Sequence, residues 1–175
     1  MGEEITIRRE WAMPNSWTFE IGPIQELVER EVENSDGLWI DPFAGKSDYA
    51  DITNDLDPER DTDYTMKASD FLEMFDENEV DGGVLFDPPY SPRQISEMYN
   101  KVGLETSMET TQATFWSDKK SEVKRIVDSG ATVLTFGWNS GGMGKTYGFT
   151  KREILLVPHG GWHNDTICVV EQYDP

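Results

Sequence analysis

The sequence of 175 residues is 37% hydrophobic and 11% aromatic, which suits one globular domain over residues 1–175 and excludes a disordered chain. Its 34 acidic and 15 basic side chains give a net charge of −19 at pH 7. A surface this acidic repels phosphate groups in dilute buffer, so it disfavours a nucleic-acid partner held by simple charge attraction.

The N-terminal segment carries no targeting signal that we recognise. The chain begins Met1-Gly2-Glu3-Glu4 with no apolar run behind it, and no later run reaches membrane-spanning length. We therefore expect a cytoplasmic protein, inside the host cell if it is viral, with no membrane partner. Residues 5 to 17 mix β-branched and aromatic side chains with arginines, which predicts an exposed strand or arm.

A helix and then a strand follow this arm. Apolar residues spaced by three and four predict an amphipathic helix over residues 23 to 32, with Pro23 in its first turn. The segment before it, residues 17 to 21, contains Phe19 and is compatible with a hydrophobic staple. Residues 37 to 45 read as a short apolar strand that runs into a Pro/Gly turn, where backbone amides can approach a ligand.

Residues 51 to 58 read as the second strand. Asp55 lies near its end, where one carboxylate can accept two vicinal hydroxyl groups, and Asp57 is the less favoured alternative. Only nine residues separate Gly45 from Asp55, whereas a parallel crossover normally needs a dozen or more with a helix. We therefore expect a shortened or missing first crossover helix and a poorly covered sheet face.

The central strand ends in a short polar motif. Residues 84 to 86 are the apolar run of a buried parallel strand, and the two prolines after Asp87 cannot donate to a ladder. The strand therefore ends at Asp87, at the sheet edge where open α/β folds bind ligands. The prolines hold their carbonyls rigidly beside this carboxylate, which suits an amine that gains positive charge, and Tyr90 offers a flat face for stacking.

The remaining elements complete an α/β pattern. Residues 91 to 94 predict a helix start, and the helix over residues 117 to 128 carries Lys119, Lys120, Lys124 and Arg125, for which a solvated face is favoured over a phosphate contact. A strand at residues 131 to 138 opens into a glycine-rich loop, and residues 153 to 170 predict a hairpin with one antiparallel strand. The single Cys168 excludes an internal disulfide, and one Cys with two His disfavours a metal site.

Four of these segments, in their order, resemble a known enzyme family. Asp87-Pro88-Pro89-Tyr90 resembles the DPPY catalytic motif of S-adenosylmethionine-dependent methyltransferases that act on the N6 amine of adenine in DNA, and the match over residues 17 to 173 is closest to compact phage or prophage types. The resemblance implies an α/β fold: a Rossmann-like, doubly wound class I methyltransferase sheet, mostly parallel, with one antiparallel strand in a C-terminal hairpin.

The resemblance also implies roles for particular residues. Asp87, Pro88, Pro89 and Tyr90 would be catalytic. S-adenosylmethionine would be bound by Phe19, by the loop Asp41, Pro42, Phe43, Ala44 and Gly45, and by Asp55, Asp70 and Phe71. In the family the acid at position 55 accepts the ribose hydroxyls, while the acid at 70 and the amide at 71 meet the adenine of the cofactor. Asp70 is also compatible with a helix N-cap. We expect no separate target-recognition domain in residues 1–175, and we expect a homo-oligomer or a protein partner to supply target recognition.

A DNA partner conflicts with the net charge unless salt screens it. At about 1 M ionic strength the Debye length is about 3 Å, so we expect a salt-adapted protein from a haloarchaeal cell or its virus. The alternatives are an acidic mesophilic protein with another substrate, a methyltransferase acting on RNA or a protein amide, and a catalytically silent binding module. Enzymes that methylate glutamine amides resemble Asn-Pro-Pro-Tyr, so Asp87 favours a nucleobase.

Overall fold

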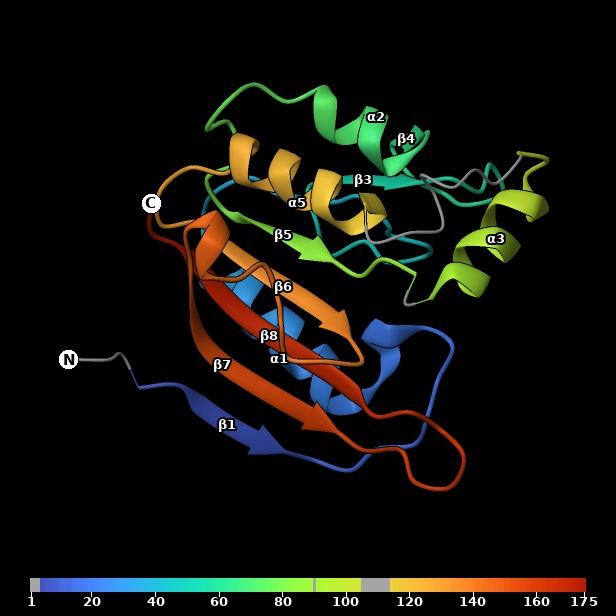
Figure 1. Ribbon diagram of the computed structural model, residues 1–175, viewed down its shortest axis with the longest axis vertical. Helices are drawn as coiled ribbons and strands as arrows, with labels where there is room; N and C mark the ends of the chain where they lie inside the picture. The colour runs from blue at the N-terminus through green and yellow to red at the C-terminus, as the bar shows by residue number, and fades with distance from the viewer. Residues whose placement is uncertain (1–3, 90, 105–113) are drawn as a thin grey trace.

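The computed structural model describes residues 4–89, 91–104 and 114–175 (Figure 1). In chain order its elements are β1 (Thr6–Arg9), η1 (Thr18–Glu20), α1 (Gly22–Glu33), β2 (Trp39–Asp41), β3 (Ile52–Asp55), β4 (Tyr64–Thr65), α2 (Ala68–Glu73), β5 (Gly83–Phe86), α3 (Pro92–Lys101), α5 (Thr114–Ile126), β6 (Thr132–Gly137), η2 (Lys145–Tyr147), β7 (Phe149–Val157) and β8 (Thr166–Tyr173). Within these ranges no helix is both long and apolar enough to cross a membrane.

The strands form one mixed sheet in the order β1-β7-β8-β6-β5-β2-β3-β4. Strand β8 runs antiparallel to both of its neighbours, β6 and β7, and the other pairs are parallel. This arrangement confirms the predicted fold class, including the antiparallel strand of the C-terminal hairpin. Because parallel strands end at the same edge, the residues that follow β2, β3, β5 and β6 meet there.

Helix α1 covers one face of this sheet (Figure 1). Its apolar residues Ile24, Leu27 and Val28 are fully buried in a cluster that includes Trp39 of β2 and Leu85 of β5. No helix lies between the parallel neighbours β2 and β3, which confirms the missing crossover helix. The expectation of a poorly covered face is wrong, however, because α1 supplies the cover from a position before β2 in the chain.

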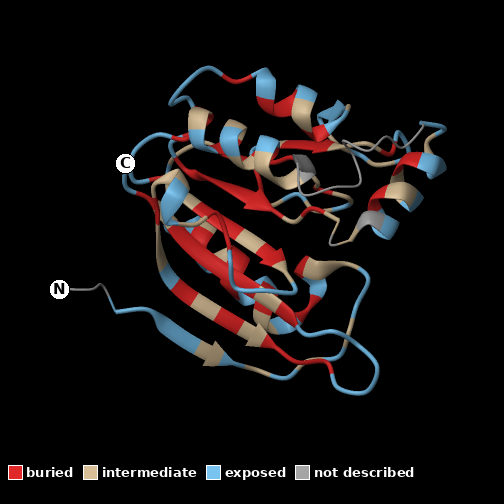
Figure 2. Cartoon of the chain, viewed as in Figure 1, coloured by how far each residue is buried: buried red, intermediate tan, exposed pale blue. Residues whose placement is uncertain are grey.

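Helices α2 and α5 cover the other face. Phe71 of α2, Phe75 just after this helix and Ile126 of α5 share a buried cluster with Val84 and Phe86 of β5. Strand β5 is therefore buried over its whole length, whereas β1 at the edge is mostly exposed (Figure 2). A strand enclosed by helices on both faces has little freedom to move, so it fixes the position of the residue that follows it.

Of the four basic residues of α5 for which we predicted a solvated face, Lys124 is exposed and the other three are not. Lys119 is only 7% exposed, and Lys120 Nζ donates to the Gly142 carbonyl at 2.7 Å. Arg125 donates to the carbonyls of Leu72 and Phe75 at 3.3 and 2.9 Å, which satisfies the C-terminal end of α2. Because α5 packs on the face of the sheet beside α2, Lys119, Lys120 and Arg125 contact protein, whereas Lys124 faces solvent.

Strand β1 is anchored to the rest of the sheet by ion pairs and a histidine. Arg8 Nε donates to Glu153 at 2.6 Å, and Arg30 of α1 pairs with the same carboxylate. Burial alone raises the pKa of Glu153, but the hydrogen bonds from the two arginines outweigh it, and the pKa falls below its ordinary value. Beyond the strand, His159 Nδ1 lies 2.9 Å from the Ala12 carbonyl.

Candidate functional site

The carboxyl ends of β2, β3 and β5 open into two adjoining cavities. The first, the motif pocket, is lined at its centre by Pro42, Phe43, Asp55, Asp87, Pro88 and Pro89. The second, the loop pocket, measures about 420 Å³ and is lined at its centre by Phe19, Phe43, Ala44, Gly45, Asp55 and Asp87. Phe43 and the two aspartates belong to both pockets, so the cavities form one continuous site.

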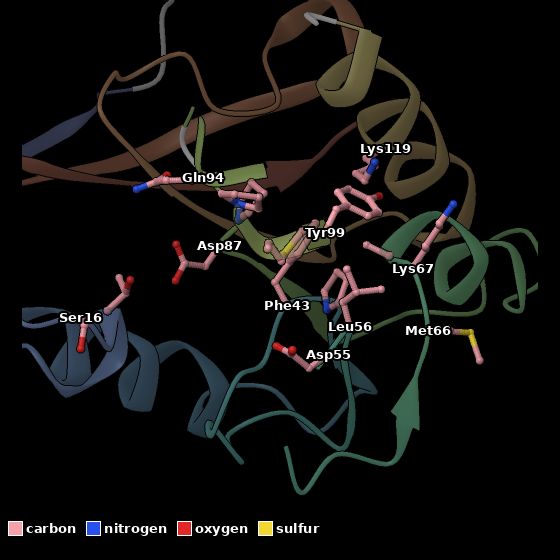
Figure 3. Close-up of a pocket in the computed structure, with 16 residues that line it drawn as sticks. Ser16, Phe43, Asp55, Leu56, Met66, Lys67, Asp87, Gln94, Tyr99 and Lys119 are labelled. Carbon is pink, nitrogen blue, oxygen red and sulfur yellow. The ribbon is translucent and has the colours of Figure 1, made fainter. Parts of the chain in front are cut away.

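Asp87 stands where the central strand stops. It follows Phe86, the last residue of β5, and is half-buried, while Pro88 behind it is buried. Figure 3 shows Asp87 and Asp55 on the wall of the motif pocket, with Phe43 between them. Asp87 therefore lines the same cavity as Phe43, Ala44 and Gly45 of the turn after β2. Tyr90, the fourth residue of the motif, lies outside the described residues.

The turn after β2 is held in shape by two carboxylates. Asp41 Oδ1 accepts from the Phe43 amide at 3.0 Å, and Asp55 Oδ2 accepts from the Gly45 amide at 2.8 Å. Gly45 has a φ of +59°, and a Cβ there would lie 2.8 Å from the Trp17 ring. Only glycine fits this position, because both the backbone angle and the tryptophan exclude a side chain.

Asp41 shapes the loop without lining either pocket. Its side chain is fully buried, and its Oδ2 has no hydrogen-bond partner among the described residues. Burial raises the pKa of Asp41 well above its ordinary value, and the nearby charges of Asp87 and Asp55 raise it further. The residue therefore supports the turn rather than meeting a ligand directly.

Asp55 and Asp57 have different surroundings. Asp55 lines both pockets, and its Oδ1 accepts from the Asp57 amide at 2.8 Å. Asp57 instead pairs with Lys101 at 2.6 Å, and that bond lowers the pKa of Asp57. A carboxylate has about four acceptor sites, so Asp55 retains capacity for two further donors from a ligand.

The structure does not bring Asp70 and Phe71 to the pocket wall. The Phe71 ring is fully buried in the core, and its amide donates to the Lys67 carbonyl at 3.0 Å. Asp70 is exposed in the first turn of α2, and the N-cap is Lys67, so the N-cap alternative is wrong. The motif pocket is lined here by Met66, Lys67 and Ala68, the residues that lead into α2.

Sequence reasoning missed several lining residues, of which Lys119 is the most unusual. Lys119 and Tyr99 lie together on the far side of the motif pocket from Asp87 (Figure 3). Burial lowers the pKa of Lys119 to about 8; the charge of Asp118 opposes this shift, and that of Lys67 adds to it. No sequence signal distinguishes Lys119 from its basic neighbours, because only the packing of α5 buries it.

A third cavity, the aromatic pocket, adjoins the motif on the side of β6. Its volume is about 420 Å³, and its lining includes Pro88, Trp116, Trp138, Asn139 and Tyr147. The glycine-rich loop after β6 therefore lies at the same edge of the sheet as Pro88. Pro88 lines both this pocket and the motif pocket, so the two spaces adjoin at this proline.

Buried Glu171 fixes the glycine-rich loop from beneath. It accepts from the amides of Met143 and Gly144 at 2.6 and 3.0 Å. Gly142 has a φ of +60°, and a Cβ there would lie 2.4 Å from the Glu171 carboxylate. The Glu171 carboxylate therefore holds the loop in place through hydrogen bonds from two backbone amides.

Comparisons with known proteins bear on the fold. No family model matches the sequence, and no curated protein matches it. Among solved structures, the chain is similar to the crystal structure of TrmN from Thermus thermophilus, with a TM-score of 0.55 and 15% identity over 87% of this chain and 49% of that one. The chain has a Rossmann-like methyltransferase fold. It spans about half the length of the structure that it matches.

Proposed function

We propose that this protein is an S-adenosylmethionine-dependent methyltransferase that modifies the N6 amine of adenine in DNA. The observation that carries the proposal is the position of Asp87, which lines the loop pocket and the motif pocket at the end of the central strand. A carboxylate there is within reach of a ligand held by the turn after β2. The methyltransferase fold supports the reaction class, and the Asp-Pro-Pro sequence supports an amine as the acceptor.

The residues present suit this cofactor. Its ribose hydroxyls would donate to Asp55, which lines the cavity and can accept two further hydrogen bonds. Its sulfonium charge suits a site in which two carboxylates, those of Asp55 and Asp87, face the same space. Phe43 and Phe19 provide apolar walls, and Phe43 packs edge-on against Phe86 with ring centroids 5.7 Å apart. When bound, S-adenosylmethionine supplies an electrophilic methyl group.

The chain's own residues would orient the acceptor. The amine donates to the Asp87 carboxylate and to the Pro88 carbonyl, so its lone pair turns toward the loop pocket. Asp87 would stabilise the positive charge that grows on the nitrogen as the carbon–nitrogen bond forms and the methyl–sulfur bond of the cofactor breaks, which leaves the neutral thioether S-adenosylhomocysteine. Because the prolines fix this geometry before reaction, little reorganisation is needed. The extra proton leaves the nitrogen afterwards, and no strong base is required.

The aromatic pocket is the natural place for the target base. Its aromatic lining suits the flat faces of a purine, and it adjoins the motif pocket at Pro88. The Thr135 hydroxyl is buried on this side without a hydrogen-bond partner among the described residues, and it lines the same space. A base in a duplex would have to leave the stack to enter, at a cost of a few kcal/mol, which is smaller in single strands.

The test is methyl transfer with identification of the product. The protein in about 2 M salt is supplied with labelled S-adenosylmethionine and unmethylated single-stranded DNA, double-stranded DNA or RNA, and the product is digested to nucleosides. We expect N6-methyladenine from DNA. Label in RNA alone would replace the DNA target, and the fold is equally consistent with that outcome. Cofactor binding without transfer to any substrate would favour a binding module.

A substitution at Asp87 tests the assigned chemistry. Asp87→Ala should abolish transfer while leaving cofactor binding largely intact, because the carboxylate acts mainly in the transition state and Asp55 still faces the sulfonium charge. Asp36→Ala is the matched control, since Asp36 is exposed and precedes β2 at the opposite edge of the sheet. Full turnover by the Asp87 variant would reject the role that we give to this residue.

A further inference from the structure

Strand β1 is the edge of the sheet, and no described element pairs with its outer side (Figure 1). Along the strand and the segment after it, every second side chain is apolar and exposed except Arg9: Ile7 is 66% exposed, Trp11 62% and Met13 68%. An exposed apolar edge strand is a template for pairing with another strand. We propose that a second copy of this chain pairs antiparallel with β1 to form a two-fold symmetric dimer.

The backbone directions restrict how two such edges can meet. The amides of Glu10 and Ala12 donate inward to the carbonyls of Leu156 and Pro158, at 2.9 and 3.2 Å. Since directions alternate along a strand, the amide and carbonyl groups of odd-numbered residues point outward. In an antiparallel pair these groups must meet their counterparts, so odd-numbered residues face odd-numbered residues.

One of the allowed registers places oppositely charged side chains of the two copies against each other. When the two-fold axis passes through Arg9, Arg9 faces Arg9 of the second copy, while Arg8 faces Glu10 of the second copy twice by symmetry. Within one copy Arg8 already pairs with Glu10 at 3.1 Å, so these four side chains would form one network across the axis, with two ion pairs between copies against one like-charge pair. Ile7 then faces Trp11 of the second copy, and Ile5 faces Met13, so apolar side chains also meet on the other face. The register centred on Arg8 instead faces Arg8 with itself and Ile7 with Arg9. The Arg9-centred register is the only one that pairs Arg8 with Glu10.

The symmetry of this dimer leaves the catalytic edges free. A two-fold axis perpendicular to the sheet reverses the strands of the second copy, so the two carboxyl edges face opposite directions. The pockets lie around β2, β3 and β5, on the far side of β7, β8 and β6 from β1. Two copies of net charge −19 repel each other in dilute buffer, so the association should strengthen as salt rises.

The first test is the mass of the full chain in solution. Sedimentation or light scattering in about 2 M NaCl, up to about 200 μM protein, should give twice the monomer mass of 20.0 kDa. Ile7→Pro removes an outward amide and leaves the inward ladder to β7 intact, a change that edge strands tolerate. This variant should be monomeric with unchanged methyl-transfer or cofactor-binding activity. A wild-type monomer at every concentration, or a dimer that survives Ile7→Pro, would overturn the proposal.

The second test addresses the register. In a dimer of Glu10→Arg, Arg8 of each copy would face an arginine at position 10 of the other copy. In a dimer of Arg8→Glu, Glu10 of each copy would face a glutamate at position 8. Each variant alone should therefore have a dimer dissociation constant at least about tenfold higher than that of wild type. Mixed together, the two variants are complementary at both pairs and should form a one-to-one dimer by native mass spectrometry. Circular dichroism confirms that each variant is folded, since Arg8 also holds Glu153. Failure of two folded variants to associate when mixed would reject the Arg9-centred register.

Discussion

Replacing Asp55 tests whether this carboxylate holds both the turn and the cofactor. In Asp55→Ala the amides of Gly45 and Asp57 lose their acceptors, each 2.8 Å away. Hydrogen bonds to a charged group contribute about 1.5–3 kcal/mol each, and the low end applies to this half-exposed residue, so unfolding should become easier by about 3 kcal/mol. Loss of two ribose contacts of similar strength should weaken S-adenosylmethionine binding by about 100-fold.

The assay is calorimetric titration with S-adenosylmethionine in about 2 M salt, beside urea unfolding of the same samples. Asp57→Asn is the matched control, because Asp57 pairs with Lys101 and lines neither pocket. Its affinity should stay within about threefold of wild type. If Asp55→Ala binds as tightly as wild type, or if Asp57→Asn loses as much affinity, the ribose contact belongs elsewhere.

Three further predictions concern stability. Burial raises the pKa of Asp41, so this group contributes its full stability below its unfolded pKa of about 3.9 and loses that contribution as the pH rises toward and through the folded value. Asp41→Asn should therefore gain stability relative to wild type in urea unfolding as the pH rises above about 4, and a difference that does not change with pH would contradict this. Glu171→Ala leaves the buried amides of Met143 and Gly144 without acceptors and should cost about 2–4 kcal/mol by the same assay, with a loss below about 1 kcal/mol as the contrary result. For the wild-type chain of net charge −19, the free energy of unfolding should be higher in about 2 M than in about 0.1 M NaCl; equal values would remove the hypothesis of salt adaptation.

Local chemistry predicted the central part of the site well. Two prolines after an apolar run can only end a strand, so the position of Asp87 follows from the sequence. Ser91 was predicted to cap the next helix, and its hydroxyl accepts from the Gln94 amide at 3.2 Å. A strand end and a helix cap both depend on residues that are adjacent in the chain, so they can be predicted from the sequence.

Features that depend on packing between distant elements were less accessible. Lys119 looked like one of four solvated cations, and its burial depends on where α5 meets the motif pocket. Phe71 was assigned to the cofactor, although its spacing of four from Phe75 already indicated the apolar face of a helix. We did not predict that α1 covers the sheet face left open by the missing crossover helix. A helix that precedes a strand can cover a sheet face as well as one that follows it, and only the three-dimensional course of α1 shows that it does so here.

The course of the chain before β2 has a consequence for how the protein responds to ligands. Ser16, Thr18 and Phe19 line the loop pocket although they precede every central strand of the sheet. One wall of the cavity is thus formed by a segment, here called the strap (residues 16–19), that takes no part in strand pairing. Whatever fills the cavity will hold this strap in place, and occupancy should therefore be readable as protection of the peptide bonds around residue 16 against proteases.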